Sequence, residues 1–372
     1  MSHTPLGWAA KKGHEEVVKL LLGRDDIDPN KPNEYGQTPL LLAACSGHEE
    51  VVELLLGREE INPNETDANG QTPLCCAAEC GHGGVVKMLL ARDDVDANKP
   101  NEGGQTPIML AAYAGYEGVV KMLLGRDDVD PDKSDISGQT PLLIAAQEEH
   151  KGVAKMLLKR YDVNPNKADE EGDTPLRSSF LKRDEELVQI LLEREDTNPN
   201  NLNWGDETPL WLAAFYGNEA MAKMLLGRDD VNPNEPEHQG KTPLGWAACN
   251  GHEKVVEILL GRDQTNPDKP NTDGRTPLWW AARRGREGVV QILLGRDDVN
   301  PDTPDDNGQT PLHCAAWNGH ENVVKILLRR DEVSPDKPDK NGLTPLSGAA
   351  ANGHTRVVAL LQPQTASTHS TD

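Results

Sequence analysis

Short apolar segments alternate with polar ones along the whole chain, and the alternation repeats every 34 residues. The dipeptide Thr-Pro marks the phase of this repeat. Its eleven copies begin at residues 4, 38, 72, 106, 140, 174, 208, 242, 276, 310 and 344. After each copy, small or apolar residues recur at helical spacing, as at Leu312, Ala315 and Ala316, which predicts a short amphipathic helix. A second apolar segment follows, as at residues 323–328, and predicts a second helix that is buried on more than one side.

Local signals mark where these helices begin and end. Thr310 is a suitable N-cap, and Pro311 occupies the first helical position, where its missing N–H costs nothing. Gly319 is placed to end the first helix in a left-handed conformation. A polar segment containing Asn307-Gly308 favours a tight turn between units. Each unit is therefore expected to be helix, turn, helix and a hairpin-like loop.

A single unit of this kind cannot bury both of its helices, so the units must stack. The sequence predicts an all-α solenoid of eleven helix-turn-helix units over residues 1–361, the first unit lacking its loop, and a disordered Ser/Thr-rich tail over residues 362–372. The outermost helices have no polar outer face. We therefore expect the chain to be a piece of a longer protein, or its ends to be covered by a partner.

The repeated motif also resembles a known family. The run Asp-x-x-Gly-x-Thr-Pro-Leu, then Ala-Ala, Gly-His, Val-Val and Leu-Leu, resembles the ankyrin repeat over about residues 1–361. The 34-residue period is similar to that of the long fungal ankyrin arrays, which often follow an NTPase or another effector domain. The resemblance implies a protein–protein interaction scaffold that binds its partner on a concave face of loop tips and first helices. Alternatives are a recognition or sensor arm cut from a larger protein, and a passive structural spacer.

Mapping that face onto the chain selects positions at the end of each first helix and at each loop tip. Aromatic residues and arginine are enriched at binding hot spots. The predicted partner-binding residues are Tyr113, Trp204, Phe215, Tyr216, Arg283, Arg284 and Trp317. The alternative for each ring is packing against the neighbouring layers. Trp8, Trp246 and Trp280 are interpreted as packing residues.

Charge and cysteine spacing limit the partners and the compartment. The net charge of −23 disfavours phosphate backbones and anionic membranes, so the sequence predicts a protein partner with a basic surface, and neither nucleic acid nor membrane. The six cysteines lack the paired spacing of a disulfide framework, and the sequence has neither a signal peptide nor a long apolar run. We expect an intracellular, cytoplasmic protein, with the nucleus as the alternative. The oligomeric state stays open.

Motifs that could carry chemistry all have a simpler structural interpretation. The run that begins His-Glu-Glu at His14 and His48 lacks the second histidine of a zinc-protease helix. The cluster of Cys75, Cys76 and Cys80 supplies too few ligands for zinc. The recurring acidic pairs each follow an arginine and indicate a structural ladder. The sequence therefore predicts no enzyme, no metal site and no cofactor, and an enzyme or metal-dependent site is kept as an alternative.

The fifth to seventh units depart from the scaffold. The fifth has Glu149 where the turn glycine is expected, and the sixth has Ser179-Phe180 in place of Ala-Ala. Phe180 is large for a close helix contact, so we expect the layers to spread there and the sixth unit to be a weak point. Both a functional kink and tolerated drift can explain these departures.

Overall fold

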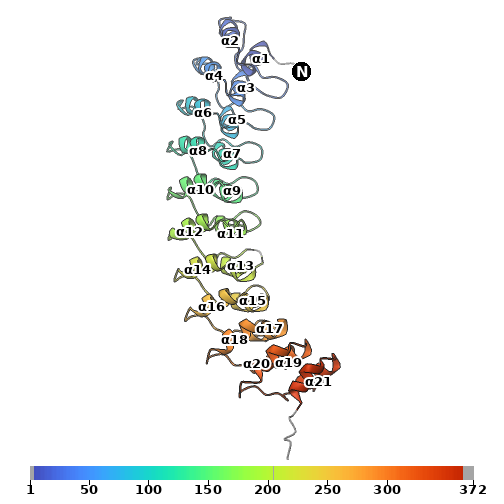
Figure 1. The fold of residues 1–372 in the computed structure, drawn as a ribbon. Coiled ribbons are helices and arrows are strands. Elements are labelled where there is room, and N and C mark those ends of the chain that lie inside the picture. The colour runs from blue at the N-terminus through green and yellow to red at the C-terminus, as the bar shows by residue number, and fades with distance from the viewer. Residues whose placement is uncertain (1–3, 204, 363–372) are drawn as a thin grey trace, which may run out of the picture. The chain divides into compact units, whose positions relative to one another are not determined.

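The computed structural model describes residues 4–203 and 205–362. Within this part the chain forms 22 helices and no strand, and the helices alternate as pairs in every repeat. The chain divides into two compact units, Met1–Thr197 and Asn198–Asp372, and each is described by itself (Figure 1). The prediction of an all-α fold with eleven helix pairs is confirmed. Apart from residue 362, the predicted tail lies outside the described residues.

The helices are short, and their bounds repeat with the period of the sequence. The first unit contains α1 (Pro5–Lys11), α2 (Glu15–Leu22), α3 (Pro39–Ser46), α4 (Glu49–Leu56), α5 (Pro73–Cys80), α6 (Gly83–Leu90), α7 (Pro107–Ala114), α8 (Glu117–Leu123), α9 (Pro141–Gln147), α10 (Lys151–Leu158), α11 (Pro175–Leu181) and α12 (Glu185–Glu193). The second unit contains α13 (Pro209–Tyr216), α14 (Glu219–Leu226), α15 (Pro243–Asn250), α16 (Glu253–Leu260), α17 (Pro277–Arg284), α18 (Glu287–Leu294), α19 (Pro311–Trp317), α20 (Glu321–Leu327), α21 (Pro345–Ala351) and α22 (Thr355–Leu361).

The predicted caps form as the sequence indicates. In α3 the Thr38 side chain accepts a hydrogen bond of 3.2 Å from the Leu41 amide, and Pro39 follows at the first helical position. Gly47 ends the helix with a φ of 73°, a left-handed conformation that favours glycine. These local signals explain why each first helix is only two turns long.

Stacking buries the apolar face of every helix. Within each unit the first helices form one row and the second helices another (Figure 1), and neighbouring first helices pack directly on each other. Ala43 and Ala44 are fully buried in that contact, and Val52 of α4 is fully buried against the row of first helices. The small alanine side chains let adjacent first helices approach closely, as the sequence pattern predicts.

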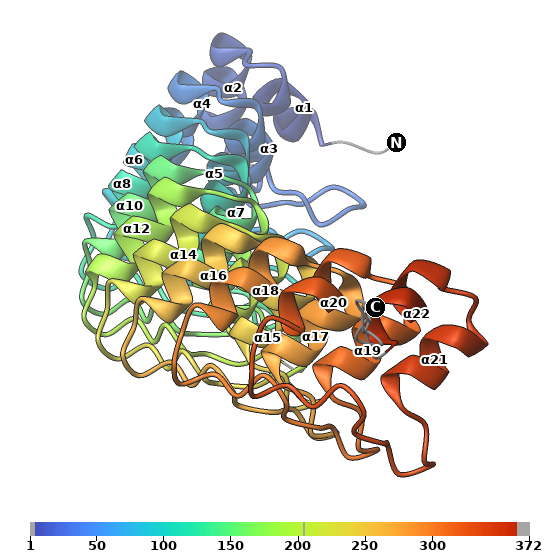
Figure 2. The same cartoon turned by 60° about the horizontal axis from the view of Figure 1, so that its bottom comes forward.

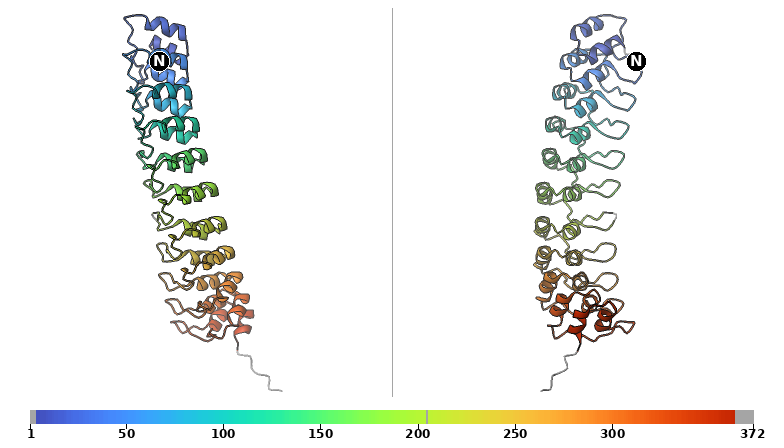
Figure 3. Two further views of the ribbon diagram at one scale, coloured as in Figure 1. Left: turned by 90° about the vertical axis from the view of Figure 1, so that its left-hand side faces the viewer. Right: turned by 45° about the vertical axis from the view of Figure 1, so that its right-hand side comes forward.

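The loops between repeats project along one side of each unit (Figure 3). In the third repeat, the Asp67 carboxylate accepts hydrogen bonds of 2.9 Å from the Asn69 and Gln71 amides, which fixes the tight turn. The next amide, Ala68, donates to the Tyr35 carbonyl of the preceding loop at 2.9 Å. Hydrogen bonds thus hold the loop in its own turn and also join it to the preceding loop.

The predicted arginine–acid ladder is present, and it also caps helices. The Arg92 guanidinium pairs with Asp94 at 2.6 Å and donates to the Leu56 carbonyl at the end of α4 at 3.1 Å. The positive charge therefore lies where the helix dipole is negative and the last carbonyls lack partners. The hydrogen bond from Arg92 also lowers the pKa of Asp94. The same pairing in neighbouring repeats supports a structural role for the ladder.

The histidines that precede the second helices are structural too. His48 Nε2 lies 3.1 Å from the Lys11 carbonyl oxygen, and His320 Nε2 lies 3.0 Å from the Arg283 carbonyl oxygen. Since a carbonyl can only accept, Nε2 must carry the hydrogen. Each ring lies against the turn glycine of the preceding repeat, where a β-carbon on Gly217, for example, would lie 2.5 Å from His252. The structural interpretation of these histidines is confirmed.

The irregular repeats put side chains into the left-handed region. Glu149, Arg183 and Asp206 have φ values of 61°, 57° and 56°, the three positive values among the non-glycine residues described. Glu149 is accommodated because Asp184, rather than a histidine ring, follows in the next repeat and caps its own helix by accepting from the Leu187 amide at 3.1 Å. Phe180 is buried, and the boundary between the two compact units follows this repeat.

Candidate protein-binding surface

The candidate surface is the face formed by the end of each first helix and the adjacent loop, called here the first-helix face. Five positions of each repeat contribute to it: the third, fourth, seventh and eighth residues after the capping threonine, and the residue immediately before it. Figure 2 shows α15, α17 and α19 of the second unit side by side, with their loops extending to one side. The regular stacking therefore sets these positions in parallel rows.

In the first unit this face carries isolated groups of different kinds. Tyr113 of α7 is 60% exposed, and its carbonyl oxygen accepts from His150. The equivalent residues in neighbouring repeats are Glu79 and Gln147, whose side chains instead pair with the loop glutamines. Tyr113 is thus accessible, as predicted, but no other predicted binding residue is within this unit.

The second unit gathers aromatic rings at the same positions. Phe215 of α13 is stacked on Trp211 at a ring-centroid distance of 4.9 Å and lies edge-on to Trp246 at 5.1 Å. Tyr216 contacts Phe215 at 5.0 Å and is 56% exposed. Offset and edge-on pairs of this kind are worth about 0.5–1.5 kcal/mol each beyond the area they bury. Phe215 is therefore a half-buried support, and Tyr216 is the accessible ring.

A lysine lies between two indoles in the next repeats. Lys241 Nζ is 3.6 Å from the Trp246 ring centroid and 3.7 Å from that of Trp280. The residue is only 5% exposed, and burial lowers the pKa of its ammonium. A buried ammonium is costly, and the two ring faces offset part of that cost by cation–π attraction. Trp246 and Trp280, interpreted from the sequence as packing residues, are half-buried and form the walls of this sandwich.

Two arginines extend the pattern, Arg275 just before α17 and Arg283 within it. Arg275 Cζ lies 4.8 Å from the Trp279 ring centroid, and Arg283 Cζ lies 5.3 Å from the same ring. Trp279 is fully buried, and its Nε1 donates to the Gln309 carbonyl at 3.1 Å, so the ring is held firmly. Arg283 and Arg284 are exposed, and neither forms an ion pair with any residue from 4–203 or 205–362.

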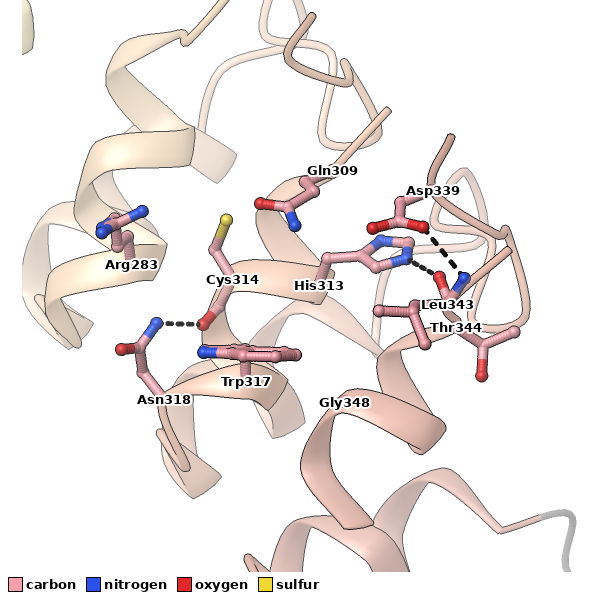
Figure 4. Close-up of a pocket in the computed structure, with 10 residues that line it drawn as sticks. All are labelled: Arg283, Gln309, His313, Cys314, Trp317, Asn318, Asp339, Leu343, Thr344 and Gly348. Atoms are coloured by element: carbon pink, nitrogen blue, oxygen red, sulfur yellow. Dashed lines mark hydrogen bonds between the residues drawn. The ribbon is translucent and has the colours of Figure 1, made fainter. Parts of the chain in front are cut away.

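A pocket of about 110 Å³ adjoins Arg283, between α17, α19 and α21 (Figure 4). Trp317, which is 46% exposed, and the buried side chains of His313 and Cys314 line it. His313 Nε2 lies 2.9 Å from the Leu343 carbonyl oxygen, which fixes the imidazole, and burial raises the pKa of the Cys314 thiol. Figure 4 shows Arg283 on one side of the pocket and His313 on the other.

The structure thus brings most of the predicted residues into one unit. Phe215, Tyr216, Arg283, Arg284 and Trp317 lie along the first-helix face of the second unit, and Tyr113 lies in the first. Trp204 lies outside the described residues. Trp8 is 47% exposed rather than packed, with Lys12 5.1 Å above its ring.

Sequence reasoning missed the cations that precede the capping threonine. That position holds glutamine in five repeats, at residues 37, 71, 105, 139 and 309, but Lys241 and Arg275 in the eighth and ninth. The same two repeats carry Trp246 and Trp280 four residues after the threonine. A cation before the threonine and a tryptophan four residues after it occur together in these two adjacent repeats, and this pattern could have pointed to the cations from the sequence. In the ninth repeat Arg286 occupies the histidine position, and its Nε donates to the Cys249 carbonyl at 3.2 Å.

The described part of the chain offers little for other kinds of site. No group of three or more histidine, cysteine, aspartate or glutamate side chains in it could hold a metal ion. Cys75 and Cys76 are buried, and the Cys45 thiol together with burial raises the pKa of Cys76. None of the helices described is long and apolar enough to cross a membrane.

Comparison with known families agrees with the repeated helix pairs. A family model described as ankyrin repeats (3 copies) matches residues 1–67, 59–135, 127–201, 180–269, 263–337 and 298–372. Together these matches cover the whole chain. No curated protein matched the sequence.

Proposed function

Because the chain belongs to the ankyrin repeat family, whose members are generally protein–protein interaction modules, we propose that it is a scaffold that binds a partner protein. The partner binds on the face of loop tips and first helices that is concave in the family. The observation that carries this proposal is the concentration of accessible aromatic and arginine side chains on the first-helix face of the second unit. The fold is typically a non-enzymatic interaction scaffold.

The character of these side chains supports a macromolecular partner. Tyr216 and Trp317 are about half exposed, and each rests on a fixed neighbour, Phe215 for Tyr216 and the α21 backbone at Gly348 for Trp317. Rigid aromatic side chains lose little conformational freedom on binding, which is why they dominate interface energetics. The net charge of −23 favours a partner with a basic surface at long range. The six cysteines lack the spacing of a disulfide framework, which favours a reducing, cytoplasmic location.

The proposal is tested by affinity capture followed by quantitative mass spectrometry. Tyr216→Ala combined with Trp317→Ala should reduce the recovery of a selective partner about tenfold or more, since two anchors are lost. The matched control is Tyr161→Ala, because Tyr161 is 98% exposed and lies in the loop after α10, away from the first-helix face. Tyr113→Ala, tested separately, shows whether the first unit contributes.

The outcomes separate the alternatives. Partner recovery that is unchanged in the double variant would refute the assignment of this face. A passive spacer predicts that the wild-type chain recovers no selective partner at all. Circular dichroism of every variant excludes unfolding as the cause of a loss.

A further inference from the structure

A cluster of positive charge stands out in the second unit, and we call it the cation–tryptophan cluster. It consists of Lys241, Arg275, Arg283 and Arg284 with Trp246, Trp279 and Trp280. The cations come from two adjacent repeats and lie close enough that Arg284 and Arg275 add to the effect of burial in lowering the pKa of Lys241. Such a concentration of cations is unusual in a chain whose net charge is −23.

Three carboxylates beside the cluster already have partners. The buried Glu237 accepts hydrogen bonds from the Gln239 and Lys241 amides and lies 2.8 Å from His238 Nδ1. Asp273 and Asp305 lie 2.8 Å and 3.6 Å from Arg275. These acids therefore neutralise Arg275 and hold the loops.

Three cations remain without a carboxylate partner. Arg283 and Arg284 are exposed, and the ammonium of Lys241 faces two rings and forms no ion pair within the described chain. Since Lys241 is more than nine-tenths buried, its charge is not solvated as a surface lysine would be. The cluster thus has two exposed guanidinium groups without an ion pair and, beneath them, a buried ammonium that the two rings and the charge of Glu237 stabilise in part.

The tryptophans hold these charges in fixed positions. Trp279 is fully buried and anchored through Nε1, and Arg283 lies over its ring. Trp279 and Trp280 are themselves in edge-on contact at 5.0 Å. A guanidinium that is already placed against a ring loses less freedom when it binds a carboxylate than one that is free in solvent.

We propose that the cation–tryptophan cluster binds an acidic peptide segment of the partner protein. Carboxylates of the segment pair with Arg283 and Arg284, with the geometry that a guanidinium fork favours. A neighbouring small side chain enters the pocket beside Arg283, which Trp317 also lines. The inference rests on the proposed function and names the chemistry of one segment, so the rest of the partner can still present a basic surface.

Charge also argues for a peptide rather than a nucleic acid. The loop tips that flank the cluster carry exposed acids, of which Asp273 is paired with Arg275 and Asp306 forms no ion pair with the described residues. A nucleic acid has a phosphate at every nucleotide and would bring some of them against these acids. A peptide needs carboxylates only where Arg283 and Arg284 lie, and the Debye length of about 8 Å at physiological salt screens the more distant negative charge.

Fluorescence anisotropy with labelled oligomers tests the proposal on the full chain at physiological salt. The probes are deca-glutamate, deca-lysine and an oligothymidylate of similar length. Deca-glutamate should bind saturably, and Arg283→Glu combined with Arg284→Glu should weaken that binding about tenfold or more. The same double variant should leave deca-lysine binding unchanged or stronger.

The matched control is Arg329→Glu combined with Arg356→Glu. These arginines are exposed in the same unit, at the ends of second-helix segments, and give the same change in charge. Deca-glutamate binding that falls equally in this control would overturn the proposal, because net charge alone would then explain it. Absence of saturable deca-glutamate binding, or tighter oligothymidylate binding through Arg283 and Arg284, would overturn it as well.

The result is separable from the test of the proposed function. If a captured partner is lost in the Tyr216 and Trp317 double variant but retained in the Arg283 and Arg284 double variant, the scaffold function stands and the acidic-segment inference fails. If both double variants lose the same partner and deca-glutamate competes for it, both proposals are supported. Lys241→Met then measures how much the buried ammonium contributes to this binding. It should weaken deca-glutamate binding by a smaller factor than the Arg283 and Arg284 double variant does.

Discussion

The two units share one scaffold but present different first-helix faces. In the first unit, the seventh position after the capping threonine holds Cys45, Glu79 and Gln147 among others, and the side chains of the two polar residues pair with loop glutamines. In the second unit, the same position holds Phe215 and Arg283 among others, and cations replace the loop glutamine in the eighth and ninth repeats. The scaffold positions are the same in both units, so the difference lies in the positions that do not repeat, which are the positions that the proposed function assigns to partner binding.

The shared scaffold is maintained by polar ladders as much as by apolar burial. Arg92 of the first unit and Arg296 of the second each donate to the last carbonyls of a preceding second helix, at 3.1 Å in both cases. Asn64 and Asn234 likewise donate to carbonyls thirty residues ahead, at 2.6 Å. Changes that break a ladder should therefore act locally, whichever unit contains them.

The largest expected effect concerns the turn glycine, which the regular repeats of both units have and the fifth and sixth repeats of the first unit lack. Gly217→Ala in the second unit forces a β-carbon into a left-handed turn and against the His252 ring, which lies 2.5 Å from its position. We expect a loss of about 2–3 kcal/mol in the stability of that region. Glu149→Gly in the first unit relieves the same conformation without a histidine contact, and should stabilise by about 1 kcal/mol.

Chemical denaturation followed by hydrogen exchange, which resolves individual repeats, measures both effects. A second replacement, His252→Ala, should restore part of the stability lost in Gly217→Ala, because it removes the contact but not the backbone strain. Equal losses with and without His252 would show that the ring contact is not responsible.

The second prediction compares the sixth repeat of the first unit with the ninth repeat of the second. The sixth has Ser179 and Phe180 in place of the alanine pair and Arg183 at positive φ, and it directly precedes the boundary between the units. The ninth has the regular Ala281 and Ala282, both fully buried. Amide exchange in α11 should be about tenfold faster than in α17. Exchange in α11 that is no faster would refute a weak point there.

Much of the fold could be predicted from the sequence, because its determinants are local and recur. The helix pairs, the threonine caps, the structural histidines and the arginine–acid ladder all follow from residues within a single repeat. The cation–tryptophan cluster could not be predicted in the same way. It depends on how Lys241 of one loop meets Trp280 of the next repeat, and that distance is set by the stacking of layers and by rotamers.

The assignment of individual binding residues was correspondingly incomplete. Phe215, predicted as a contact residue, stacks on Trp211 and lies against Tyr216, and its part in partner binding stays a prediction. A ring at a surface position of one repeat can be covered by a larger ring of the adjacent repeat, as Trp246 covers Phe215 at 5.1 Å. Composition at a single position does not reveal such neighbours.

The smallest expected effect concerns the loop asparagines that donate to a carbonyl thirty residues ahead, as Asn64 and Asn234 do. Each unit has aspartate in place of this asparagine in at least one repeat. Asp268 of the second unit accepts from the Asn300 amide at 2.6 Å, but its other carboxylate oxygen is buried without a hydrogen-bond partner. Burial raises the pKa of Asp268. Asp132 of the first unit is the matched case, with its pKa also raised by burial, but Lys167 Nζ lies 3.8 Å away and offsets part of the charge.

Asp268→Asn should therefore stabilise the protein at neutral pH by about 1 kcal/mol, since an amide restores the missing donor. Asp132→Asn should stabilise it less, because the replacement also loses the attraction of Lys167.

A carboxyl group whose folded pKa is raised destabilises the fold when it is ionised, so this penalty is present above the folded pKa and disappears as the pH falls through that value towards the unfolded pKa. The advantage of Asp268→Asn, measured by denaturation as a function of pH, should shrink on acidification over that interval. An advantage that stays constant with pH would mean that the charge of Asp268 is not its cause, and equal gains from the two replacements would mean that Lys167 contributes nothing to the first unit.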